Sequence, residues 1–188
     1  VLRRQYYIRV VAAREGSPAA KAGLLPGDYI RAIDDNPTRM MSVIKGDRLL
    51  RGEPGSTVTL TVIRGNAAEP LEMEIERSSD RSASVTSRLI SPELGYLRIS
   101  EFDDTATEAI QAATEAFEQQ NIKRLLIDLR GNANGKLESG LDAARLFSTE
   151  DTLAIRESTD EQVPVSILGR APSVVWPVAI ITNPGTAG

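Results

Sequence analysis

The chain contains neither histidine nor cysteine among its 188 residues. The lack of histidine excludes a Ser-His-Asp or Cys-His catalytic arrangement. The lack of both residues excludes the usual zinc sites, iron–sulfur clusters and disulfides. We therefore expect no metal and no cofactor, and any nucleophilic or acid–base chemistry must use Ser, Thr, Lys, Asp, Glu or Tyr.

The chain also lacks long apolar runs and an excess of positive charge. No segment approaches the ~18 consecutive apolar residues of a membrane-spanning helix, so no integral membrane segment is expected. The net charge of −4 argues against nucleic-acid binding, which usually requires a basic face. The first residue is Val1 and not methionine, which indicates a processed or truncated segment. For that reason, the missing signal peptide does not indicate a cytoplasmic location.

Short strands and turns are predicted for the first third of the chain. Runs of β-branched, aromatic and apolar residues bounded by turn residues predict strands at 7–11, 29–33, 57–63 and 71–75. Ser17 followed by Pro18 predicts a short helical turn over 18–22, because serine is a good N-cap and proline fits the first helical position. Apolar spacing from Met40 to Leu50 predicts a second helix that ends near Gly52.

A different pattern follows the small, polar residues 77–84 (RSSDRSAS), which predict a linker. We expect strands at 95–102 and 125–129, helices that begin near 105 and 137, and a buried apolar run at 174–181. Thr105 and Glu108 have the spacing of a capping box. Alternating strands and helices indicate a right-handed α/β layer.

The N-terminal region resembles the PDZ domains of bacterial proteases over residues 15–34 (EGSPAAKAGLLPGDYIRAID) and 49–62 (LLRGEPGSTVTLTV). Such domains bind a peptide as an added strand and hold its terminal carboxylate with backbone N–H groups. In these domains the carboxylate loop precedes the strand that 7–11 matches. Residues 1–5 contain no glycine, so this loop is predicted to be missing or incomplete. Met40, Met41 and Ile44 are candidates for a peptide side-chain pocket, and core packing is the alternative role for at least two of them.

The second half resembles the carboxyl-terminal processing peptidases, which are tail-specific proteases of bacteria and chloroplasts. The resemblance rests on residues 95–102 (GYLRISEF), 126–137 (LIDLRGNANGKL) and 178–188 (VAIITNPGTAG). It implies an α+β multidomain protein with a β-barrel-like PDZ domain at 1–77 and a linker at 78–84. Residues 85–188 would form the first part of an α/β peptidase core of the ClpP/crotonase kind.

The resemblance also implies site residues and a reaction. In this family, backbone N–H groups of an NPGG loop bind the oxyanion, a serine attacks, and a lysine with a lowered pKa accepts its proton. Asn134 and Gly135 stand at the oxyanion-loop positions, and Gly188 stands where the family has its nucleophilic serine. Asn134 tolerates positive φ better than most residues, so we expect it to preserve the loop.

Two departures from the family pattern shape the functional prediction. Position 188 has no serine hydroxyl, and no lysine-bearing helix follows it in the sequence, so this chain is predicted to be an inactive part of a Ser/Lys endopeptidase. The alternative is a pseudo-protease that acts as a peptide-binding or scaffold module. An acyl-transfer enzyme on the same fold is a weaker third hypothesis, against which the PDZ domain argues.

The residues around 128–136 also allow two other interpretations. The spacing from Gly131 to Lys136 is one residue short of a P-loop and lacks its Ser or Thr, which argues against nucleotide binding. Asp128 and Arg130 are predicted to form a structural ion pair at a strand end. By resemblance, the expected partners are protein or peptide C-terminal tails and the expected location is the periplasm or cell envelope. Self-association into a homo-oligomer is left open.

Overall fold

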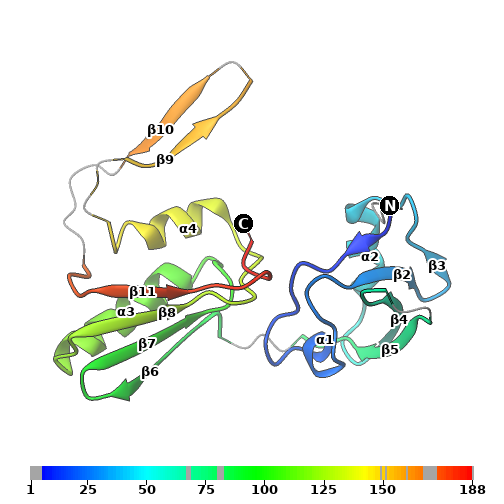
Figure 1. Ribbon diagram of the computed structural model, residues 1–188, viewed down its shortest axis with the longest axis horizontal. Helices are drawn as coiled ribbons and strands as arrows, with labels where there is room; N and C mark the ends of the chain where they lie inside the picture. Colours follow the sequence, from blue (N-terminus) through cyan, green and yellow to red (C-terminus); the bar gives the residue numbers. More distant parts are fainter. Residues whose placement is uncertain are drawn as a thin grey trace. The chain divides into compact units, whose positions relative to one another are not determined.

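A computed structural model describes residues 6–66, 69–79, 83–148, 150, 152–159, 161–166 and 173–187 (Figure 1). The chain forms two compact units: the first comprises residues 1–82 together with the short segment 183–187, and the second comprises residues 83–182. Within the described ranges, no helix is long and apolar enough to cross a membrane. The two units are described separately below.

The first unit is a small antiparallel sheet with two short helices. Its elements are β1 (Ile8–Arg9), α1 (Pro18–Lys21), β2 (Tyr29–Ile33), β3 (Asn36–Pro37), α2 (Val43–Leu50), β4 (Thr57–Ile63) and β5 (Leu71–Glu76). The strand order is β1-β2-β4-β5, and β3 pairs with β2. The core is formed by Val10, Leu24, Ile30, Ile33, Val58, Leu60, Val62 and Ile75. β2 and β4 have the predicted bounds, because alternating apolar residues bury one face of each strand.

Two polar side chains fix the local structure around α1. The Ser17 hydroxyl accepts a hydrogen bond from the Ala20 N–H at 3.2 Å, which confirms the predicted N-cap. Asp28 is buried, accepts the Leu25 N–H at 2.8 Å, and binds the Arg64 guanidinium through both carboxylate oxygens at 2.8 Å. Arg64 holds the pKa of the Asp28 carboxyl below its ordinary value. The turn before β2 is therefore tied to the end of β4.

The second helix begins later than predicted. Ser42 caps α2 by accepting the Lys45 N–H at 3.2 Å, so the helix starts at Val43. Met40 lies outside the helix with φ of +64°. The prediction that Met40 belongs to the helix was wrong, because the apolar spacing did not reveal the cap at Ser42.

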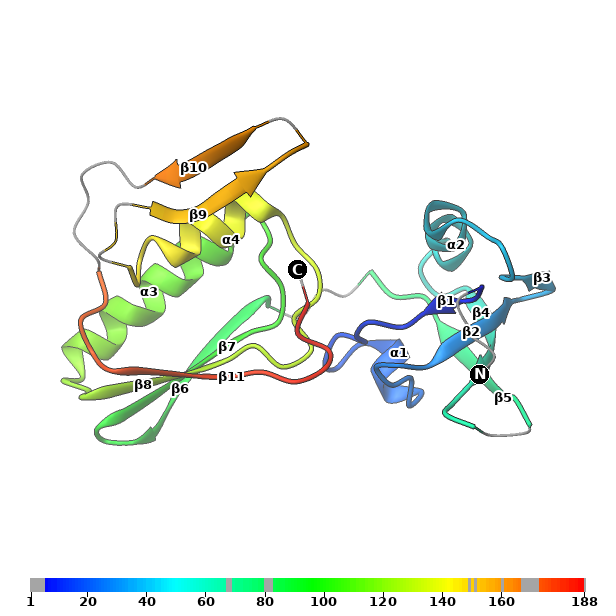
Figure 2. The ribbon, with the colours of Figure 1, turned by 45° about the horizontal axis from the view of Figure 1, so that its top comes forward.

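The second unit contains a four-stranded sheet with two helices on one side (Figure 2). Its elements are β6 (Val85–Ser91), β7 (Leu94–Ile99), α3 (Ala106–Gln119), β8 (Arg124–Asp128), α4 (Leu137–Ala144), β9 (Thr152–Glu157), β10 (Gln162–Ser166) and β11 (Val178–Ile181). The strand order is β11-β8-β7-β6, in which β7, β8 and β11 are parallel and β6 is antiparallel. The predicted α/β layer is confirmed by the sequence β7, α3, β8, α4, β11.

The start of α3 differs from the predicted capping box. The Thr105 side chain makes no cap hydrogen bond to the helix. Instead, Asp103 Oδ1 accepts from the Thr105 N–H at 2.9 Å and from its hydroxyl at 2.8 Å. The capping-box prediction was wrong, because the preceding aspartate binds the hydroxyl that would have capped the helix.

The expectation of a buried run at 174–181 is also corrected. Within the described ranges, β11 is an edge strand that pairs with β8 alone, and the side chains of Val178 and Ile180 are 39% and 59% exposed. Their register opposite Leu125 and Ile127 places them on the same face of the sheet as those two core residues. The residues are apolar as expected, but little of the described chain covers this end of the core face.

Candidate functional site

The loop after β8 presents backbone N–H groups that have no partner within the described residues. Phe102 forms an isolated parallel bridge with Gly135: its N–H donates to Asn134 O at 3.4 Å and its carbonyl accepts the Lys136 N–H at 2.9 Å. This pattern directs the N–H of Gly135 away from Phe102. In the part of the chain that the structure describes, no hydrogen bond uses the N–H of Asn134 or Gly135. Both groups are chemically suited to bind an oxyanion.

Glycine is required at position 135 for two reasons. Its φ is +127°, and a Cβ at this position would lie 2.5 Å from Phe102 O. Asn134 is not among the described residues with positive φ, so the expectation that it preserves the loop through positive φ was wrong. Its side chain instead donates to Glu101 Oε1 at 2.8 Å. The close approach of Phe102 makes Gly135 irreplaceable, although only this glycine of the family motif is retained.

A buried carboxylate fixes the first part of this loop. Asp128, at the end of β8, is fully buried and accepts the Arg130 N–H at 3.0 Å, the Arg130 guanidinium at 2.6–3.1 Å and the Tyr96 hydroxyl at 2.7 Å. Arg98 donates to the carbonyls of Asp128 and Arg130 at 3.1 and 2.6 Å. The predicted Asp128–Arg130 ion pair is therefore present, and it anchors the strand end from which the loop begins.

The same contacts shift the pKa values of Asp128, Arg130 and Tyr96. The Arg130 guanidinium holds the pKa of the Asp128 carboxyl far below its usual range, and Asp128 in turn raises the pKa of Arg130. Burial, followed by the hydrogen bond to Asp128, raises the pKa of the Tyr96 hydroxyl. Asp128 is therefore ionised and Tyr96 protonated at neutral pH, which is the state required by their hydrogen bond.

The segments that resemble the peptidase family contain three further residues of interest, Lys136, Asn183 and Gly188. Lys136 Nζ binds the exposed Asp104 carboxylate at 2.6 and 2.7 Å. Asn183 shapes the turn before the chain end by accepting the Thr186 N–H at 2.8 Å and the Gly185 N–H at 3.0 Å. Gly188 lies outside the described residues. Among those described, no group of three or more acidic side chains could hold a metal ion.

An apolar cavity of about 500 Å³, here called the α4 cavity, adjoins the Gly135 loop. Its lining includes Ile99, Phe102, Ile127, Ala143, Val178 and Ile180. Phe102 connects the two features, because its backbone pairs with Gly135 and the residue also lines the cavity. This role of Phe102 was not identified from the sequence, where the residue appeared only as the end of a predicted strand.

In the first unit, β1 is the edge strand of its sheet, and among the described residues no strand pairs with its other side, here called the open edge. The Val10 N–H donates to Asp28 O and the Val10 carbonyl accepts the Gly27 N–H, both at 2.8 Å. Because successive residues of a strand direct their backbone groups to opposite sides, Arg9 and Val11 direct theirs to the open edge. This edge can accept an added peptide strand.

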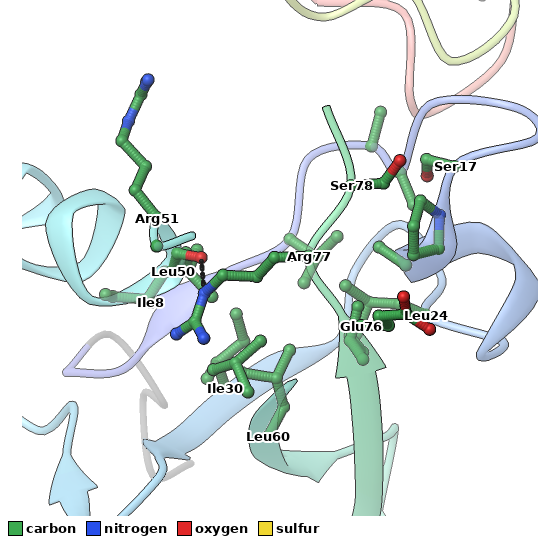
Figure 3. Close-up of a pocket in the computed structure, with 18 of the residues that line it drawn as sticks. Ile8, Ser17, Leu24, Ile30, Leu50, Arg51, Leu60, Glu76, Arg77 and Ser78 are labelled. Carbon is green, nitrogen blue, oxygen red and sulfur yellow. Dashed lines mark hydrogen bonds between the residues drawn. The ribbon is translucent and has the colours of Figure 1, made fainter. Parts of the chain in front are cut away.

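A second cavity of about 740 Å³, here called the β1 cavity, runs along this strand (Figure 3). It is lined by Ile8–Ala13 of the β1 segment, by residues 50–52 at the end of α2, and by residues 75–78 at the end of β5. Ile30, Val58 and Leu60 from the buried core also line it. The predicted peptide-binding residues Met40, Met41 and Ile44 are not among its lining residues. Met40 and Ile44 are instead 76% and 69% exposed, and their role stays a prediction.

Arg77 crosses the β1 cavity and holds the end of α2 (Figure 3). Its Nε donates to Leu50 O at 2.9 Å and its Nη2 to Leu49 O at 3.0 Å. Its Nη1 donates to Thr57 O at 2.8 Å and to Ser56 Oγ at 2.9 Å. A cation at this point also stabilises the helix C-terminus electrostatically. The sequence placed Arg77 in the polar linker pattern and gave no signal for this role.

Replacing Arg77 with lysine is expected to lower the free energy of unfolding of the first unit by about 2 kcal/mol. A lysine ammonium keeps the charge but cannot reach acceptors on α2 and β4 at the same time. Hydrogen exchange of the Arg51 amide, which is bonded to Asp47 O, should become faster in the variant. Lys45→Arg on the exposed side of α2 is the control, and equal effects of both changes would contradict this role of Arg77.

Each of the two units matches a known protein family. Residues 9–64 match the PDZ domain family and residues 93–188 match peptidase family S41. The chloroplastic carboxyl-terminal-processing peptidase 2 of Arabidopsis thaliana is 30% identical over 193 residues, which cover 95% of this chain and 36% of the relative. The carboxyl-terminal-processing protease of Synechocystis is 30% identical over 187 residues, which cover 96% of this chain and 43% of the relative.

A solved structure, the photosystem II D1 C-terminal processing protease, matches with a TM-score of 0.89 at 26% identity. The match covers 97% of this chain and 51% of that chain. The chain thus spans about half of the length of these proteins or less. The resemblance drawn from the sequence motifs is confirmed by these matches. The chain belongs to peptidase family S41, with the carboxyl-terminal processing peptidases that carry a PDZ domain.

Proposed function

We propose that the chain supplies the tail-binding domain and the oxyanion loop of a carboxyl-terminal processing endopeptidase of the Ser/Lys type. The observation that carries the proposal is the N–H of Gly135, which has no hydrogen-bond partner among the described residues and is held in place by the bridge to Phe102. A preorganised N–H donor of this kind stabilises the developing negative charge on the attacked carbonyl, and loss of one such donor typically costs about 10²–10³ in kcat.

The first unit would bind the substrate tail, and the second unit would bind the scissile carbonyl. The backbone groups of Arg9 and Val11 on the open edge of β1 would pair with a substrate tail as an added strand. At the other site, the scissile carbonyl oxygen would accept from the N–H of Gly135, and the apolar lining of the α4 cavity would receive an apolar side chain next to the scissile bond. Position 188 has glycine where the family has its nucleophile, so we propose that these 188 residues bind tails without cutting them.

A pseudo-protease that binds tails as a scaffold is the second candidate, and glycine at position 188 favours it. Incubation of the full-length parent protein with an unstructured substrate that has an apolar C-terminus separates the two. Cleavage, followed by mass spectrometry, would exclude the pseudo-protease. Binding without cleavage would exclude the peptidase. We further propose a periplasmic or cell-envelope location, which subcellular fractionation of the parent protein would test.

A separate experiment tests whether the 188-residue chain itself binds peptide tails. A short fluorescent peptide with an apolar C-terminus and a free carboxylate is expected to bind, as measured by fluorescence anisotropy. Val11→Pro should weaken binding about tenfold or more, because proline removes a backbone N–H from the open edge of β1. Val11→Ala keeps that N–H and serves as the control. Equal binding by the wild type and the proline variant would contradict strand addition at β1.

A further inference from the structure

Asn134 and Gly135 form the single Asn-Gly pair of the sequence. In such a pair, the backbone nitrogen of the glycine can attack the side-chain amide carbon of the asparagine, because glycine has no Cβ to hinder the approach. Both residues are exposed in the loop after β8. The two reacting groups are therefore accessible to water, which supplies the base for the attack and later hydrolyses the product.

The Gly135 nitrogen can lose its proton more readily than a hydrogen-bonded amide. Its N–H has no partner among the described residues, and the bridge to Phe102 directs it away from that residue. No hydrogen bond within the described chain therefore has to break before a base removes this proton. The bond on the other side of the pair is long, since the Phe102 N–H and Asn134 O are joined at 3.4 Å. The loop thus exposes the nucleophile and restrains Asn134 only weakly.

Four other asparagines of the chain each lack one of these conditions. Asn36 and Asn183 precede proline, which has no N–H. Asn132 is buried, its side-chain amide donates to a backbone carbonyl at 3.1 Å, and the alanine that follows it has a Cβ that hinders the attack. Asn121 precedes the β-branched and buried Ile122. The combination of exposure, an unhindered nucleophile and an N–H without a described partner distinguishes Asn134 from these four.

We propose that Asn134 is a site of spontaneous deamidation in the folded chain. The Gly135 nitrogen gives its proton to water or hydroxide and forms a bond to Asn134 Cγ. The Cγ–Nδ2 bond then breaks, and the amide nitrogen takes up a proton from water and leaves as ammonia. Water hydrolyses the resulting cyclic imide. Addition of water at Cγ gives aspartate at position 134, and addition at the main-chain carbonyl carbon gives isoaspartate.

Both products are incompatible with contacts that hold this loop. Asn134 Nδ2 donates to Glu101 Oε1 at 2.8 Å, whereas a carboxylate has no N–H to donate and places a second negative charge against Glu101. Isoaspartate also adds a carbon atom to the main chain between Asn134 and Gly135. The two hydrogen bonds of Phe102, to Asn134 O and from the Lys136 N–H, then no longer have matching spacing. Deamidation is therefore expected to release the loop from Phe102.

Ageing of the purified 188-residue chain under native, mildly alkaline conditions tests the modification. Trypsin releases residues 131–136 as one peptide, since an arginine precedes it and a lysine ends it, so Asn132 and Asn134 are compared in the same molecule. We expect mass spectrometry to show a gain of about 1 Da at Asn134 that accumulates about tenfold faster than at Asn132 or Asn121. Chromatography separates the aspartate and isoaspartate forms, and a digest at the start corrects for reaction during digestion.

Asn134→Gln is the matched control for this assay and should remove the signal, because a longer side chain does not form the same five-membered ring. Equal rates at Asn134 and Asn132 would overturn the proposal. Reaction at Asn134 only after the chain is unfolded in urea would also overturn it, because the loop would then protect the pair. Neither outcome depends on whether the parent protein is a peptidase, so the proposed function is not tested by this experiment.

Asn134→Asp reproduces the aspartate product and tests its effect on the loop. Hydrogen exchange of the Lys136 amide, which donates to Phe102 O at 2.9 Å, should become about fivefold faster or more. Addition of Glu101→Gln supplies an N–H donor for the new carboxylate and should restore slow exchange. Asn134→Ala removes the hydrogen bond without adding charge and should have a smaller effect. Unchanged exchange in Asn134→Asp, or acceleration that Glu101→Gln does not reverse, would overturn the release of the loop through Glu101.

Discussion

Asp128→Ala is expected to lower the free energy of unfolding of the second unit by about 3 kcal/mol at pH 7. The substitution removes the acceptor of the Tyr96 hydroxyl, the Arg130 N–H and the Arg130 guanidinium at a fully buried position. It also leaves the Tyr96 hydroxyl without its partner in the interior. Urea unfolding followed by Trp176 fluorescence would measure the loss, because Trp176 is the only tryptophan and packs against the core of this unit.

The effect of Asp128 is expected to depend on pH in a defined direction. Arg130 lowers the pKa of Asp128 in the folded unit, whereas the unfolded chain has a pKa of about 3.9. The folded state therefore binds fewer protons at this group, so the stabilisation is fully present above about pH 5 and is lost as the pH falls through 4 and below. The stability difference between wild type and Asp128→Ala should shrink over that interval.

Asp142→Ala is the control for this prediction. Asp142 pairs with Arg145 on the exposed surface of α4, and exposed ion pairs contribute about 0–1 kcal/mol. Its replacement should change the unfolding free energy by less than about 0.5 kcal/mol. If the difference between wild type and Asp128→Ala stayed constant down to pH 2, ionised Asp128 would not be the stabilising species.

Gly135→Ala is expected to cost about 3 kcal/mol and to displace the oxyanion loop. Two effects add: alanine is strained at a φ of +127°, and its Cβ would lie 2.5 Å from Phe102 O. Relief of this contact requires Phe102 and the loop to separate, which breaks the hydrogen bond from the Lys136 N–H to Phe102 O. Urea unfolding would give the free energy, and faster hydrogen exchange of the Lys136 amide would report the separation.

Gly131→Ala separates the two effects within the same loop. Gly131 also has a positive φ, +68°, but a Cβ there would have no atom within 4 Å. Its replacement should therefore cost only the backbone strain, about 1 kcal/mol. Equal costs for the two alanine variants would show that the contact with Phe102 contributes nothing.

The sequence predicted those elements whose own residues determine burial and capping. The bounds of β2 and β4 follow from alternating apolar residues between turns, and the Ser17 cap follows from local chemistry. β6 and the β9–β10 hairpin were not predicted, because most of their side chains are exposed and the apolar alternation is weak. The exposure of β11 depends on what packs against it, which an apolar run alone does not reveal.

The residues of the functional site were likewise predicted only where a local sequence pattern identifies them. Asn134 and Gly135 were located from the family motif, and the Asp128–Arg130 pair from adjacency in the sequence. The bridge from Phe102 to Gly135 joins residues that are far apart in the chain, so no local pattern could predict it. The reach of Arg77 to the end of α2 is likewise a product of tertiary structure.

The hydrogen bonds of Arg77 also have a mechanical consequence. Its backbone N–H donates to Ser56 O and its carbonyl accepts the Gly55 N–H, both at 2.7 Å, while its guanidinium holds the last two carbonyls of α2. Tension on the chain that leaves the first unit after Arg77 is therefore borne by the end of α2 as well as by the sheet. A force on the chain after Arg77 and a displacement of α2 would therefore strain the same hydrogen bonds.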